Sequence, residues 1–191
     1  MTTDPSTHIF WITSRAAGIA ALVLASVAVL VGLCMGTGLL GGKGRGTDLR
    51  ALHETLSLST LVAIAVHGGA LLFDSFINFG IADITIPFAS AYKGIWMAMG
   101  IIGGYGLAFL GLSYYAKNKI GPARWRKLHR YTALAWVLGI AHSLGTGTDA
   151  GQTWFLAMTG IVVIPALVLL VWRLSGGGAQ RQRAPRAARA S

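Results

Sequence analysis

The chain has 191 residues, of which 54% are hydrophobic and only 12% charged, and its formal net charge is +10. This composition excludes a disordered chain, and it disfavours a soluble globular domain, where about 25% of residues are charged. The single cysteine, Cys34, excludes an intramolecular disulfide and an iron–sulfur cluster held by thiolates of one chain.

Five uncharged segments are long enough, or nearly so, to cross about 30 Å of hydrocarbon as helices. In chain order they are residues 16–42, 55–73, 94–116, 131–148 and 150–172. Residues 75–92 contain Pro87 between charged flanks and are expected to lie at the outer interface rather than to span. The sequence therefore predicts an all-α fold, a polytopic membrane helix bundle of about five transmembrane helices.

Basic residues are unevenly distributed between the two ends of these spans. Fourteen of the sixteen Lys and Arg residues lie between spans one and two, between spans three and four, or after span five. The positive-inside rule predicts a multi-pass protein of the cell (inner or plasma) membrane with its N-terminus outside. The lipid bilayer is then the partner that explains the basic excess, and no nucleic acid is expected.

Two parts of unequal size are predicted on this basis. Residues 1–174 are expected to form the transmembrane domain. Residues 175–191 consist mainly of Gly, Ala, Arg and Gln, and they are expected to form a disordered basic cytoplasmic tail.

Four of the five histidines, His53, His67, His129 and His142, lie within the second and fourth uncharged segments or two residues before them, and are assigned to the second and fourth spans. Ionisable residues inside a membrane are costly and are functional candidates by default. Both spans run from inside to outside, so spacings of 14 and 13 residues correspond to about 21 Å and 19.5 Å along the helices. This places His53 level with His129, and His67 level with His142.

Two facing neutral imidazoles can ligate a haem iron on both sides, and the apolar porphyrin suits a bilayer interior. The spacing therefore predicts two b-type haems, one held by each histidine pair. Propionates need cations near the interface, and Arg50, Arg126 and Arg130 are placed at the inner side to supply them. A tetrahedral zinc site fits less well, because the four histidines do not converge on one point.

The fourth span poses a geometric difficulty for this prediction. Thirteen steps along a straight helix rotate a side chain by about 220° net, so His129 and His142 would point to different sides. A bend or bulge, for instance near Gly139, is required. Two alternatives remain open: a histidine-based proton channel or small transporter without haem, and a non-catalytic subunit that stabilises a partner.

These residues resemble the ferric reductase-like transmembrane domain, the haem-bearing core of ferric reductases, NADPH oxidases and the haem subunit of the bacterial methionine sulfoxide reductase system. The resemblance covers about residues 10–172. It is carried by Leu52-His53 and His67-Gly68-Gly69, and by Gly121-Pro-Ala-Arg-Trp-Arg-Lys-Leu-His129-Arg130 with the later His142. It implies a membrane cytochrome b in which these histidines ligate two stacked haems that pass electrons across the membrane.

Two departures from that family change what the resemblance implies. Many members have six spans, whereas five are predicted here. The larger oxidoreductases also carry flavin and nicotinamide domains after the last span. In this sequence a short basic segment follows instead. The resemblance therefore implies an oxidoreductase subunit for electron transport that receives electrons from a redox partner protein or a quinol.

Overall fold

The computed structural model describes residues 8–40, 45–74 and 78–176, and within these ranges it contains helices and no strand. The elements are α1 (Ile9–Thr37), α2 (Arg45–Leu71), α3 (Ile81–Thr85), α4 (Gly94–Leu112), the 3₁₀ turn η2 (Ser113–Ala116), α5 (Lys117–Ile120), α6 (Pro122–His129), α7 (Thr132–Thr146) and α8 (Thr153–Leu174). The predicted all-α bundle is confirmed. Most of the predicted tail, residues 177–191, lies outside the described residues.

Four helices in the described ranges are long and apolar enough to cross a membrane: α1, α2, the continuous helical segment Gly94–Ile120, and α8. The remaining predicted span, residues 131–148, is not a single long helix. It corresponds to α7, whose 15 residues extend over about 22 Å. A turn at Arg130 and Tyr131 separates α7 from α6, so this part of the chain is a broken helix.

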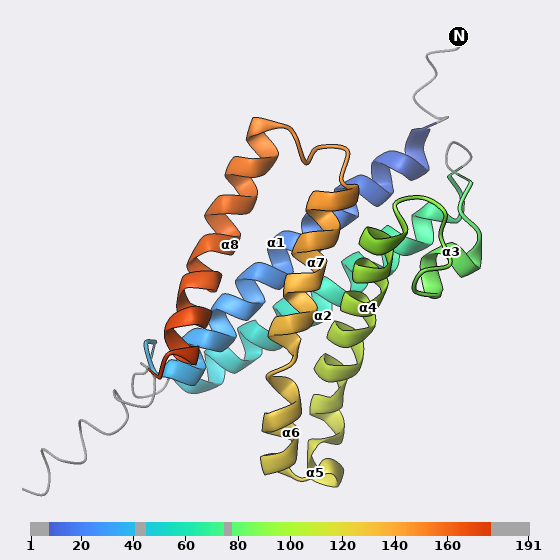
Figure 1. The fold of residues 1–191 in the computed structure, drawn as a ribbon. Coiled ribbons are helices and arrows are strands. Elements are labelled where there is room, and N and C mark those ends of the chain that lie inside the picture. Colours follow the sequence, from blue (N-terminus) through green and yellow to red (C-terminus); the bar gives the residue numbers. More distant parts are fainter. Residues whose placement is uncertain (1–7, 41–44, 75–77, 177–191) are drawn as a thin grey trace, which may run out of the picture.

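The helices are arranged as two antiparallel pairs with α8 added at one side (Figure 1). α1 packs along α2 and also contacts α8, while α4 packs along α7. α2 and α7 run in the same direction, but within the described residues they do not pack closely on each other. The four predicted histidines lie between these two helical segments.

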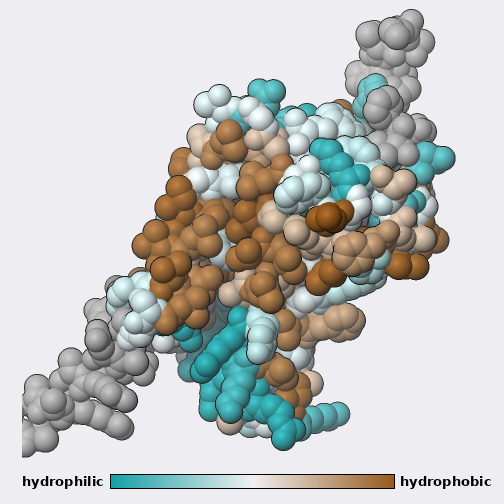
Figure 2. Space-filling view, in the orientation of Figure 1, coloured by the Kyte–Doolittle hydropathy of each residue, from teal (hydrophilic) through white to brown (hydrophobic). Residues whose placement is uncertain are grey.

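The surface of the bundle is divided into apolar and polar regions. Figure 2 shows hydrophobic side chains over α8 and the neighbouring helices, and hydrophilic side chains at the end formed by α5 and α6. Several of these hydrophilic side chains are cations of α6, where Arg124, Arg126 and Lys127 are all exposed. A broad apolar surface next to a basic end is typical of a protein that spans a bilayer and reaches water at its ends.

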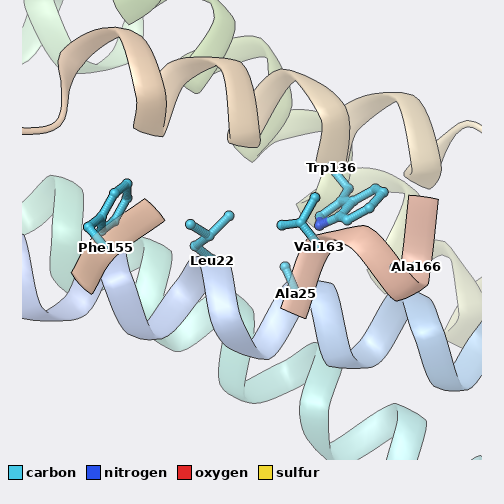
Figure 3. Close-up of a cluster of buried hydrophobic side chains, with 6 residues drawn as sticks. All are labelled: Leu22, Ala25, Trp136, Phe155, Val163 and Ala166. Carbon is cyan, nitrogen blue, oxygen red and sulfur yellow. The ribbon is translucent and has the colours of Figure 1, made fainter. Parts of the chain in front are cut away.

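The best-buried side chains join α1, α7 and α8. Trp136 of α7 is 1% exposed and packs with Leu22 and Ala25 of α1 and with Val163 and Ala166 of α8 (Figure 3). Its indole Nε1 donates a hydrogen bond of 3.0 Å to the hydroxyl of Ser26. The only polar atom of the indole is thereby satisfied within the bundle, so the whole side chain can be buried.

We expect the Trp136→Ala substitution to lower the free energy of unfolding by about 3–5 kcal/mol, because it leaves a large cavity at this three-helix contact. Trp136→Phe keeps most of the ring and removes the hydrogen bond to Ser26, so its cost is about 1 kcal/mol. Reversible denaturation in detergent measures both values. Trp154→Ala is the matched control, because Trp154 is 48% exposed, and an equal loss there would contradict the assignment.

Candidate functional site

The structure brings the four predicted histidines together in two pairs. The ring centres of His53 and His129 are 6.2 Å apart, and those of His67 and His142 are 6.1 Å apart. We name these the inner pair and the outer pair, following the orientation predicted from charge. Each pair takes one ring from α2 and one from the broken helix α6–α7, as the spacing predicts.

The separation within each pair is compatible with a metal ion between the rings. Metal–imidazole bonds are about 2.0–2.1 Å long for zinc, so a metal between two imidazoles holds the ring centres about 6 Å apart. The ring planes are inclined by 83° in the inner pair and by 76° in the outer pair. Direct edge-to-face contact of two rings has a similar separation, so the hydrogen bonds of each ring are needed to decide what it can do.

His67 is oriented by the facing helix α1. Its Nδ1 donates a hydrogen bond of 2.8 Å to the carbonyl oxygen of Ser14 and lies 3.0 Å from the Ser14 hydroxyl. Because a carbonyl only accepts hydrogen bonds, Nδ1 carries the proton and Nε2 keeps its lone pair for a metal. The ring lies against Gly18, where an added Cβ would be 3.0 Å from Nδ1.

His53 is held by the same arrangement 14 residues, or about four turns, further along α1. Its Nδ1 donates to the carbonyl of Ala28 at 2.9 Å, and its ring lies against Gly32, where an added Cβ would be 3.0 Å from Cε1. In both cases the glycine follows the accepting carbonyl by four residues, so it occupies the same side of α1 one turn later. The missing side chain leaves room for the ring to reach the backbone.

α4 provides a third copy of this arrangement for the outer pair. The Nδ1 of His142 donates to the carbonyl of Trp96 at 2.9 Å, and four residues later Gly100 faces the ring. An added Cβ at Gly100 would be 2.7 Å from Cε1 of His142. Both rings of the outer pair are therefore fixed in the tautomer that leaves Nε2 available.

His129 differs from the other three histidines. Its buried Nδ1 has no hydrogen-bond partner of good geometry among the described residues, and the backbone of Leu110 lies near the ring. Its ring stacks on Trp125, with the centres 4.9 Å apart and the planes inclined by 26°. Its orientation thus depends on an aromatic neighbour in its own helix.

The bend required between His129 and His142 is present, but the expected position near Gly139 is wrong. α7 is continuous through Gly139, and the interruption lies at Arg130 and Tyr131, directly after His129. There the amide of Tyr131 bonds to Leu128 and that of Ala133 to Arg130, both three residues back. Such 3₁₀ turns advance about 120° per residue instead of 100°, which reduces the angular mismatch of the 13-residue spacing.

A cavity of about 210 Å³ opens beside the outer pair, and both His67 and His142 line it. At its rim Arg15 of α1 forms a two-point ion pair with Asp149 in the loop between α7 and α8. Sequence reasoning missed this pair, because the two residues lie on different segments and no spacing relates them. The guanidinium also lies over the ring of Trp11, 5.1 Å from its centre.

The three predicted propionate partners occupy exposed positions. Arg50 lies one turn before His53 on α2, Arg126 one turn before His129 on α6, and Arg130 in the turn that follows. Glu54, next to His53, accepts a hydrogen bond of 2.6 Å from the hydroxyl of Tyr115, which links α2 to η2 near the inner pair. The roles of the arginines toward a cofactor remain predictions.

The chemistry open to these pairs is limited by their donor number. In the described part of the chain, no group of three or more His, Cys, Asp or Glu side chains converges. Two imidazoles per site cannot complete a tetrahedral zinc centre, but they could supply the protein ligands of a metal whose other donors belong to a macrocycle. Comparisons with protein-family models, with curated proteins and with solved structures found no significant match for this chain.

Proposed function

We propose that the protein is a di-haem membrane cytochrome b that transfers electrons across the cell membrane, as in the ferric reductase-like family. The single observation that supports this most is the recurrence of a 6 Å histidine pair at two levels of the same two helical segments. A bound haem supplies one-electron iron chemistry at each level. A redox centre would thus lie near each face of the membrane.

The side chains of this protein would hold both haems and keep their ligands in position. His53 and His129 would hold the inner haem, and His67 and His142 the outer one. The hydrogen bonds from Nδ1 to the backbone carbonyls of α1 and α4 make the ligands more basic and fix the ring orientation. Exposed Arg50, Arg126 and Arg130 would pair with the propionates of the inner haem.

The separation of the levels also suits a transfer between two membrane faces. Electrons would come from a redox partner protein or a quinol and would leave to an acceptor on the other side. With the N-terminus outside, α5 and α6 face the cytoplasm, and the Arg15–Asp149 ion pair lies at the outer side. The basic surface of α6 is then available to an acidic partner at the cytoplasmic face.

The test is a reduced-minus-oxidised spectrum of the full chain purified after haem-replete expression, with haem counted as the pyridine haemochrome. We expect two b-type haems per chain and the absorption of six-coordinate, low-spin iron. A chain that folds in detergent yet carries no haem would falsify the proposal. Proton flux into liposomes by such haem-free protein would then support the channel alternative.

A further inference from the structure

The two histidine pairs are not built alike, although their ring separations are nearly equal. His67, His53 and His142 each donate from Nδ1 to a backbone carbonyl and lie against a glycine four residues beyond it. The buried Nδ1 of His129 lacks such a hydrogen bond within the described residues. The inner pair therefore combines one firmly held ring with one that is held less firmly.

The local structure around Leu110 explains the difference. The Leu110 carbonyl near His129 accepts a hydrogen bond of 2.6 Å from the Ser113 hydroxyl, which competes with a bond from His129 for this oxygen without excluding it. That hydroxyl accepts one of 3.1 Å from the indole of Trp125. α4 ends at Leu112 and continues as a 3₁₀ turn, so the α-helical carbonyl–glycine arrangement stops here, and the residue four positions after Leu110 is Tyr114.

The spacing of the histidines agrees with this explanation. The facing carbonyls on α4, Trp96 and Leu110, are 14 residues apart, as are Ser14 and Ala28 on α1. His53 and His67 have the same spacing of 14, whereas His129 and His142 are 13 apart. In an antiparallel helix pair, equal spacings keep both contacts in register. The shorter spacing in α6–α7 leaves His129 out of register with its carbonyl.

We propose that His129 is an exchangeable ligand, so that the inner site, and not the outer one, binds a small neutral ligand of ferrous iron such as carbon monoxide. This inference rests on the proposed haem-binding function. A buried N–H group whose hydrogen bond is poorly formed is held less firmly than one with a good acceptor, and rotation of the His129 ring out of its ligating position sacrifices little. His67, His53 and His142 would instead break a hydrogen bond if they rotated.

The protein as it exists provides the first test. The purified full chain is reduced with dithionite and titrated with carbon monoxide, and the difference spectrum is scaled to the haem content. We expect one carbon monoxide per chain that carries two haems. Binding of none, or of two with equal affinity, overturns the proposal.

Two matched variants identify the site that binds. His129→Ala opens the inner site, and we expect one carbon monoxide per chain if the inner haem stays and none if it is lost. His142→Ala opens the outer site, and we expect two if the outer haem stays and one if it is lost. The proposal is overturned if the exchangeable ligand lies in the outer pair. In that case His129→Ala binds two carbon monoxide molecules if the inner haem stays and one if it is lost. His142→Ala then binds one if the outer haem stays and none if it is lost.

These outcomes are separate from those that test the proposed function. A chain without haem contradicts both proposals, because no iron is present to titrate. A chain that carries two low-spin haems but does not bind carbon monoxide contradicts only the proposal that His129 is an exchangeable ligand. Haem content and carbon monoxide stoichiometry are measured on the same sample, so a variant that loses one haem remains informative.

Discussion

Replacing one histidine of a pair is expected to reduce the number of bis-histidine haems per chain from two to one. The reason is that each pair supplies both axial ligands of one site, and the two sites lie about 20 Å apart along the helices. His53→Ala should therefore remove the low-spin signal of the inner haem and leave the outer one. Electron paramagnetic resonance of the oxidised protein, together with the haem count, measures the result.

Double variants make this prediction sharper. Because the members of a pair act as one unit, His53→Ala combined with His129→Ala should have the same effect as either change alone. The cross-pair combination of His53→Ala with His67→Ala should remove both bis-histidine haems. If His53 and His67 behaved as one unit instead, the pairing seen in the ring distances of 6.2 Å and 6.1 Å would not be the ligating one.

The histidine pairing could be predicted from sequence because it depends on quantities that a helix fixes. Rise per residue and the alternating direction of consecutive spans set the level of each histidine, whatever the packing details are. The same reasoning predicted a bend between His129 and His142 but not its position. The turn lies at Arg130 and Tyr131, and the uncharged run after Arg130 gives no sign of it.

The residues that orient the histidines could not be predicted from the sequence, for a different reason. They depend on the register of α1 against α2 and of α4 against α7, which no local pattern specifies. One signal was nevertheless present, because Gly18 and Gly32 have the same spacing as His53 and His67. Equal spacings on two consecutive antiparallel spans are what a repeated contact between them requires. The Arg15–Asp149 ion pair has no comparable signal.

The largest effect on haem binding expected from a residue other than the histidines is that of Gly100→Ala. An added Cβ would lie 2.7 Å from Cε1 of His142, closer than real contacts allow, so the ring must move. The haem-free chain can accommodate the added methyl group by rotating His142, but this rotation breaks the hydrogen bond to Trp96 and withdraws Nε2 from the site. Overpacking of about 1–3 kcal/mol corresponds to binding that is about fivefold to 150-fold weaker, so we expect loss of the outer haem with the inner one retained.

Two further glycines of α4 serve as controls for this effect, and haem content and thermal unfolding are measured for all three variants. Gly111 has no atom within 4 Å of its added Cβ, so Gly111→Ala should keep both haems. Gly103→Ala should destabilise the whole bundle, because its Cβ would lie 2.9 Å from the backbone oxygen of Ala135, which cannot rotate away. Loss of both haems from Gly100→Ala with an unfolding temperature as low as that of Gly103→Ala would mean that Gly100 supports helix packing rather than the ligand. Retention of both haems would mean that His142 does not need the carbonyl of Trp96 to reach its position.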